Sequence, residues 1–176
     1  MANREALREL QTRLASRLQA ARSEGAAVRW LAVEVGGGHY LFPLAQCGEI
    51  FPWTSVQPAA YTQPWFMGVA NLRGGLFGVV DLARFLLPVV PSVRTDTPVS
   101  ECSLLSLNAG TEVNCALLVS QLSGLRGPES FTGSQSPPAD APAYFGRVYT
   151  DAAGLAWQEM NLLTLSQSPS FLSIGA

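Results

Sequence analysis

The sequence predicts a mainly β protein made of two small β-barrels that lie side by side with a groove between them. Short segments of alternating apolar and polar residues, separated by glycine turns, are typical of small barrels, because closure of a sheet removes its unpaired edges. A weak internal repeat divides most of the chain into two similar halves. The length, 176 residues, fits one domain or two small packed subdomains.

The internal repeat relates residues 28–87 to residues 101–165. In each half a strand, a turn and two further strands are followed by a hairpin and a short helix. When the halves are aligned, Asp81 lies opposite Asn161, and each residue precedes the short helix of its half. Asp and Asn accept hydrogen bonds from the unpaired N–H groups of a first helical turn, so both residues are predicted to cap these helices.

Residues 4–22 are predicted to form an amphipathic helix, because leucines recur at spacings of three and four residues. Residues 1–22 contain five Arg and two Glu, whereas the rest of the chain contains six Arg and eleven acidic residues. Two interpretations remain open: the helix packs on its own domain, or it docks onto a partner. The leucines of the stripe are Leu7, Leu10, Leu14 and Leu18.

These patterns divide the chain into an N-terminal helical extension, a β domain with two intertwined subdomains, and a C-terminal tail. Residues 127–142 are rich in Pro, Ser and Gly and lack periodicity, so they are predicted to form a long loop. The expected boundaries are 1–25 for the extension, 26–168 for the domain, about 28–100 and 101–168 for the subdomains, and 169–176 for the tail.

The composition favours a binding protein over an enzyme. Only 14% of the residues are charged and 48% are hydrophobic, and a surface that is poor in charge tends to contain apolar contact sites. The single histidine, His39, lies in a predicted turn, and the cysteines Cys47, Cys102 and Cys115 have no metal-like spacing. No Ser or Cys stands in a context that would activate it as a nucleophile. We therefore expect neither catalysis nor a cofactor.

Charge and hydropathy also exclude two classes of partner. The net charge is −2 and no basic residues cluster on the β domain, so a nucleic-acid partner is not expected. No apolar segment approaches the length of a membrane span, and the charged N-terminus does not resemble a signal peptide. An odd number of cysteines fits a reducing compartment, so we expect a cytoplasmic protein without direct membrane insertion.

Between Tyr40 and Leu82 the sequence resembles the CheW-like family, the adaptor proteins of bacterial chemosensory arrays. The resemblance rests on HYLFPL, on Cys47-Gly48-Glu49-Ile50, on GVANLRGG and on the Asp-Leu helix start, in that order. It covers roughly residues 28–166. Ser120 stands where the family usually has an Asp. The leucine-striped helix and the tail SPSFLSIGA resemble the variant of this adaptor found in type IV pilus (twitching-motility) chemosensory systems.

The resemblance implies a fold of two five-stranded SH3-like β-barrels around a groove, and a non-enzymatic adaptor. Its implied partners are the regulatory domain of a CheA-like histidine kinase and the cytoplasmic tip of a methyl-accepting chemoreceptor. The family's functional charge pair falls on Glu49 and Arg73, which could otherwise be a solvated strand glutamate and a turn arginine. The alternative function is a tandem β-barrel that binds a small molecule or another ligand outside chemotaxis. The predicted partner-binding residues are Glu49, Arg73, Cys47, Ile50, Asn71 and Gly74.

Overall fold

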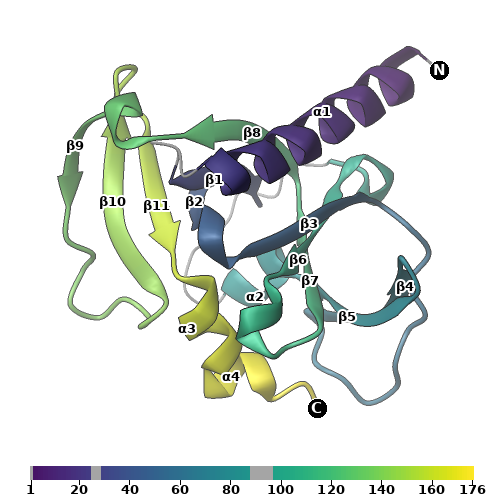
Figure 1. Ribbon diagram of the computed structural model, residues 1–176. Helices are drawn as coiled ribbons and strands as arrows, with labels where there is room; N and C mark the ends of the chain where they lie inside the picture. Colours follow the sequence, from purple (N-terminus) through teal and green to yellow (C-terminus); the bar gives the residue numbers. More distant parts are fainter. Residues whose placement is uncertain (1, 25–28, 88–96) are drawn as a thin grey trace.

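Two curved β-sheets and one long helix dominate the structure, a computed structural model that describes residues 2–24, 29–87 and 97–176 (Figure 1). The first sheet has six strands in the order β8-β1-β2-β11-β10-β9. The second has five strands in the order β3-β6-β7-β5-β4. The strands are β1 Trp30–Val35, β2 Gly38–Pro43, β3 Cys47–Pro52, β4 Phe66–Leu72, β5 Gly75–Asp81, β6 Ser103–Leu107, β7 Cys115–Val119, β8 Gln121–Arg126, β9 Phe131–Gln135, β10 Phe145–Asp151 and β11 Ala156–Met160.

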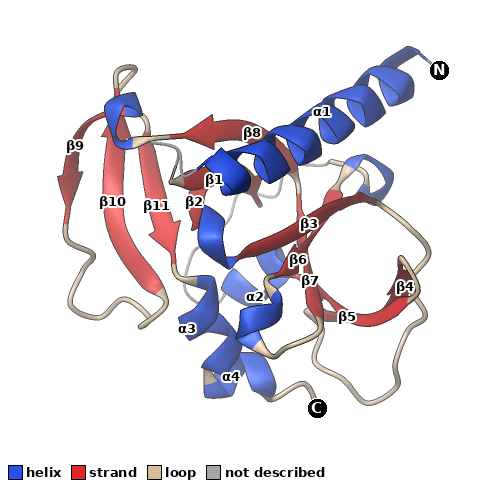
Figure 2. Ribbon diagram, in the orientation of Figure 1, coloured by secondary structure: helices blue, strands red, loops and turns tan. Residues whose placement is uncertain are grey.

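Four α-helices and four short 3-10 turns complete the described part of the chain. The long helix α1 crosses over the two sheets, whereas α2, α3 and α4 gather at one end between them (Figure 2). The helices are α1 Ala2–Glu24, α2 Leu82–Leu86, α3 Leu162–Gln167 and α4 Pro169–Leu172. The 3-10 turns are η1 Leu44–Gln46, η2 Val99–Glu101, η3 Ala109–Thr111 and η4 Pro128–Ser130.

Each sheet is built from strands of both halves of the chain. In the first sheet β1 pairs with β8, and β2 lies parallel to β11. In the second sheet β6 pairs with β3, and β7 lies parallel to β5. The strands β1 to β5 correspond in order to β6, β7, β8, β10 and β11. When each strand is replaced by its counterpart, the order β8-β1-β2-β11-β10 of the first sheet becomes β3-β6-β7-β5-β4, the order of the second. The strand pairing thus follows the internal repeat, but the predicted boundary at about residue 100 does not separate the sheets.

The strand β9 has no counterpart in the first half, and it corrects the prediction of a long loop over 127–142. It pairs with β10 at the edge of the first sheet, which therefore has six strands instead of the expected five. Only Phe131 is half-buried, with its ring centroid 5.7 Å from that of Trp30, and the other β9 residues are exposed and polar or Gly. A strand with one anchoring side chain has no alternation that sequence analysis can detect.

The predicted barrels are present as curved sheets. Within the described residues no strand ladder joins β3 to β4 or β8 to β9, which are the ends of the two sheets. The mainly β class, the paired sheets, the N-terminal helix and the short helices agree with the prediction.

A central hydrophobic core joins both sheets and all four helices. Strands near the middle of each sheet are buried on both faces, so that odd and even residues enter different cores. In β7, Cys115, Leu117 and Val119 face the central core, whereas Ala116 and Leu118 face a smaller core inside the second sheet. In β1, Leu31 joins the central core and Ala32 a third core inside the first sheet. Each large apolar side chain that is fully buried contributes roughly 1.5–3 kcal/mol.

The helix α1 packs on its own domain, which is the first of the two interpretations of the leucine stripe. Leu14 and Leu18 are buried in the central core. Leu7 is half-buried and Leu10 remains 43% exposed, so the stripe is only partly covered. The helix lies against β3 of one sheet and β8 of the other. It therefore bridges the two sheets, and the groove between two subdomains stays a prediction.

The short helices α2 and α3 provide the first testable prediction. The side chains of Asp81 and Asn161 accept hydrogen bonds from the N–H groups of Arg84 and Thr164, as the sequence predicted for two caps. We expect Asp81→Ala to lower the free energy of unfolding by about 1 kcal/mol. Asn161→Ala should cost more, because its Oδ1 also accepts from Gln46 Nε2 at 3.2 Å. Urea denaturation measures both, and an equal loss on Asp140→Ala, an exposed control, would contradict capping.

Candidate functional site

The predicted charge pair forms in the structure. Arg73 Nη1 lies 3.1 Å from Glu49 Oε2, and the two side chains are 77% and 48% exposed. Glu49 belongs to β3, and Arg73 follows β4, the strand at the opposite end of the same sheet. Curvature of the sheet brings these ends together. An ion pair this exposed contributes only about 0–1 kcal/mol to stability, so its geometry is more informative than its energy.

A β-bulge turns Glu49 outward. In the pairing of β3 with β6, Cys47 lies opposite Leu107 and Ile50 opposite Leu105, so Gly48 and Glu49 share one partner, Ser106. The Ser106 hydroxyl accepts from Glu49 N at 2.7 Å and donates to Glu49 O at 3.4 Å. A Cβ at Gly48 would overlap Ser106 and the backbone of Leu107. Bulges of this kind redirect a side chain, and this bulge directs the carboxylate of Glu49 toward Arg73.

Arg73 occupies an unfavourable backbone conformation. Its φ is +49° and that of Gly74 is +79°, the signs that a two-residue type I′ hairpin turn requires. Such a turn favours Asn or Gly at the first position, and a longer side chain there costs about 1 kcal/mol. The Asn71 side chain stabilises the turn, because its Oδ1 accepts from Gly74 N at 2.9 Å. The fold therefore tolerates an arginine that turn geometry alone would not select.

The second half of the chain lacks this feature. Its equivalent turn, between β10 and β11, contains Ala152, Ala153 and Gly154, and only Gly154 has a positive φ, of +81°. The repeated hairpin can thus form without an arginine. This asymmetry is the sequence signal that separates Arg73 from the residues that only build the turn.

The other predicted site residues have different positions. Asn71 and Gly74 are exposed and shape the turn, and a Cβ at Gly74 would meet only open space. Ile50 is half-buried beside Glu49 and packs against the central core. Cys47, predicted as a partner-binding residue, is wholly buried in the central core, which corrects that prediction to a packing role. Its sulfur lies 3.5 Å from the carbonyl oxygen of Pro43.

Sequence analysis did not place α1 beside this pair. A cleft of about 330 Å³ lies between one side of the helix, β3 and the β4–β5 turn. A second cleft, of about 290 Å³, lies along the other side of α1 beside β8. Thr12, Ala15, Ser16 and Gln19 recur at spacings of three and four residues, a signal that sequence analysis could have found without knowing what they faced. The first cleft is lined by Thr12, Ala15, Ser16, Leu18, Gln19, Gly48, Glu49, Ile50 and Arg73.

The thiols are poorly suited to nucleophilic chemistry. Burial raises the pKa of Cys102 to about 11, with smaller contributions from the carboxylates of Asp81 and Glu101. Burial alone raises the pKa of Cys115 to about 12. Both thiols are therefore protonated at neutral pH, and the thiolate is the reactive form. Within residues 2–24, 29–87 and 97–176, no three His, Cys, Asp or Glu side chains gather as a metal site would require.

The structure is a β-sheet domain in which the two halves of the chain exchange strands. It carries an exposed charge pair, a site that suits binding to another molecule. The CheW-like domain model matches residues 29–150, and the chain belongs to this family. Among curated proteins it is similar to Protein PilI of Pseudomonas aeruginosa, with 25% identity over 166 residues that cover 92% of this chain and 88% of PilI.

A solved structure supports the fold. The scaffolding protein TtCheW from Thermoanaerobacter tengcongensis superimposes with a TM-score of 0.62 at 14% identity. The match covers 77% of this chain and 91% of TtCheW, and at this identity it shows the fold alone. The helices of the described residues include none that is both long and apolar enough to cross a membrane.

Replacement of Arg73 tests whether the arginine contributes to the stability of the fold. In Arg73→Asn the exposed ion pair is lost, at a cost of about 0–1 kcal/mol, but Asn adopts positive φ more readily. We expect the melting temperature to stay constant or to rise by a few degrees, measured by calorimetry. Gly74→Ala, which places a Cβ at φ +79°, should lose about 1 kcal/mol. A loss above about 2 kcal/mol in Arg73→Asn would make the arginine structural.

The buried thiols give a third prediction. Because the pKa of Cys102 is raised to about 11 and that of Cys115 to about 12, both should react slowly with iodoacetamide at about pH 8 in the folded protein. In denaturant the thiol pKa returns to about 8.5, and all cysteines should react rapidly. Mass spectrometry of timed samples measures the rates. Fast modification of the folded protein would show that the core opens frequently.

Proposed function

We propose that the protein is a non-enzymatic adaptor that couples methyl-accepting chemoreceptors to a CheA-like histidine kinase. Membership of the CheW-like family supports the class of function. The overall similarity to PilI, over 92% of the chain, favours a chemosensory system of type IV pili and twitching motility. The protein then acts in the cytoplasm, at membrane-associated receptor arrays.

The exposed pair of Glu49 and Arg73 is the observation that carries this proposal. It occupies the two positions where the family resemblance places a functional charge pair. The arginine stands at a turn position with positive φ, where Asn or Gly would be less strained, and the bulge at Gly48 directs the glutamate toward it. Strain of this kind is retained where function depends on it. Arg has five N–H donors, so a guanidinium paired through Nη1 can still bind a partner's carboxylate or carbonyl.

The mechanism of such an adaptor is scaffolding. A protein that binds both the kinase regulatory domain and the receptor tip raises the effective concentration of each for the other. If its affinity for one partner depends on the conformation of the other, the two binding events are thermodynamically coupled. No group on the adaptor has to take part in a chemical step.

A charge-reversal experiment tests the proposal. Purified protein is titrated with the kinase regulatory domain and with the receptor tip, and affinity is measured by calorimetry. We expect Arg73→Glu to weaken binding of at least one partner about tenfold or more, with the melting temperature within a few degrees of the wild type. Glu49→Arg should weaken the same partner, and the double exchange should recover part of the affinity.

Arg147→Glu is the matched control. Arg147 is an exposed arginine of β10, the strand that corresponds to β4 in the second half, and it donates to Ser134 Oγ. The Arg147→Glu variant should bind both partners as the wild type does. A wild-type protein that binds neither partner would refute the adaptor function. Unchanged affinity in Arg73→Glu would refute the role of the charge pair.

A further inference from the structure

The helix α1 is an addition to the family domain. It covers Ala2–Glu24, whereas the family model matches residues 29–150. Leu14 and Leu18 anchor it in the central core, and Gln11 Nε2 donates to Ser103 Oγ at 2.6 Å. These contacts fix the helix relative to both sheets. Its position beside β3 is therefore a property of the folded protein.

One side of α1 faces the charge pair across a cleft of about 330 Å³. The helix contributes Thr12, Ala15, Ser16 and Gln19 to the cleft at intervals of three and four residues, which places them on one side of the helix. With a rise of 1.5 Å per residue, this side is about 10 Å long. Glu49 and Arg73 line the opposite side of the cleft.

We infer that α1 forms part of the partner-binding site, so that the protein bound by Glu49 and Arg73 also contacts Thr12, Ser16 and Gln19. This inference rests on the proposed function, and it deepens that function by adding a helix outside the family domain to the site. Any partner group that reaches Arg73 through the cleft lies between α1 on one side and the sheet on the other. The helix therefore adds a second surface to the site, beside the sheet that carries Glu49 and Arg73.

The occupant that fits the cleft best is an acidic helical segment of the partner. Residues 1–22 carry a net charge of +3, from five Arg and two Glu, whereas the rest of the chain carries −5, from six Arg and eleven acids. The α1 arginines are absent from the described lining of the cleft and only make its surroundings basic, so the cation that an occupant meets within this lining is the exposed guanidinium of Arg73. Its straight helical side, formed mainly by short side chains, suits a second helix packed alongside α1. Carboxylates on that helix would meet Arg73.

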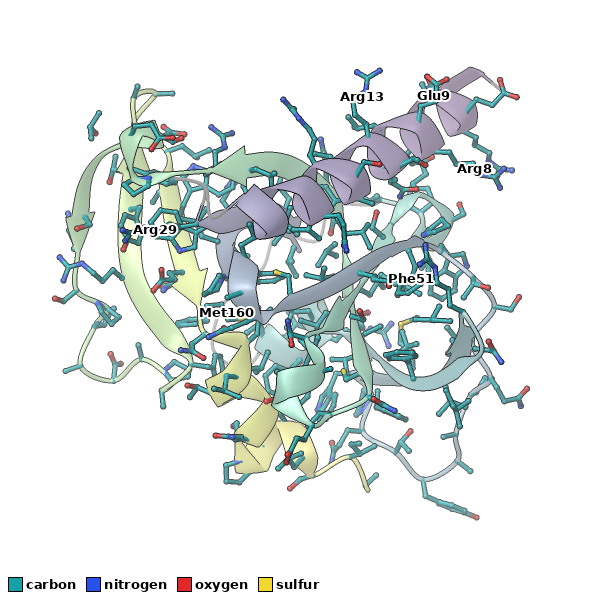
Figure 3. All side chains as sticks on the ribbon, in the orientation of Figure 1. Arg8, Glu9, Arg13, Arg29, Phe51 and Met160 are labelled. Carbon is teal, nitrogen blue, oxygen red and sulfur yellow. The ribbon has the colours of Figure 1, made fainter. Side chains whose placement is uncertain are left out.

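A pair of tryptophan variants tests the contribution of α1. Ser16 lines the cleft, whereas Arg13 is exposed, lies outside both clefts and extends from α1 away from the sheets (Figure 3). Ser16→Trp narrows the cleft and should weaken the Arg73-dependent partner about tenfold. Arg13→Trp places the same side chain on the same helix and should change the affinity less than about twofold. Circular dichroism confirms that both variants fold.

Hydrogen exchange of the wild-type complex supplies a readout that does not depend on a variant. We expect the amides of α1 around residues 12–19 to exchange more slowly when the partner is bound. Faster exchange on binding would mean that the helix leaves its place against the sheets to admit the partner, and it would overturn the inference. Equal affinity of Ser16→Trp and Arg13→Trp, while Arg73→Glu still weakens binding, would also overturn it and leave the adaptor function intact. If the wild type binds neither partner, the inference fails with the proposed function.

The acidic character of the occupant has its own test. Ser16→Glu and Ser16→Gln introduce side chains of equal size that differ in charge. Ser16→Glu should weaken binding about fivefold more than Ser16→Gln, because it places a carboxylate opposite the partner's carboxylates. The difference should shrink at about 0.5 M salt, where charges are screened over a few ångströms. Equal affinities of the two variants at low salt would show that the occupant is not acidic.

Discussion

The exchange of strands between the two halves of the chain is the constraint on which the rest of the structure depends. Each half contributes to both sheets, through the parallel pairs β5 with β7 and β2 with β11. The strands that cross over are buried on both faces, so one strand serves a core inside its sheet and the central core between the sheets. The anchoring of α1, α2, α3 and α4 in that central core follows from this arrangement, because the apolar faces of both sheets meet there.

The candidate site uses the rigidity that the exchange provides. Exposed ion pairs contribute little to stability, and a non-glycine residue at positive φ is unfavourable, so neither feature of Arg73 strengthens the fold. Both features persist because the hairpin and the bulged strand are held by a well-packed sheet. The turn presents the guanidinium, the bulge presents the carboxylate, and curvature of the sheet brings them within 3.1 Å. A binding surface on such elements requires little ordering when a partner arrives.

Local sequence patterns predicted the local structure well and the long-range structure poorly. Helix caps at Asp81 and Asn161, the glycine turn before β2 and the leucine stripe of α1 depend on neighbours within a few residues. The strand order depends on pairings between residues more than a hundred positions apart, such as Tyr40 with Gln158, which leave no periodic signal. Exposed polar strands such as β9 escape detection, and so does the burial of Cys47 among polar neighbours. Of the site, the family resemblance located the charge pair, but nothing in the sequence placed α1 beside it.

The internal repeat has a consequence for the origin of the molecule. Two identical half-chains that exchanged strands in this way would form a homodimer with two-fold symmetry, and neither would have a complete sheet alone. Such a dimer carries every surface feature twice. Fusion of the two copies into one chain removes that requirement and lets each half diverge. The present chain is asymmetric in this way, because Arg73 is aligned with alanines in the turn of the second half. Its charge pair is therefore carried once, on one side of a molecule whose strand order repeats.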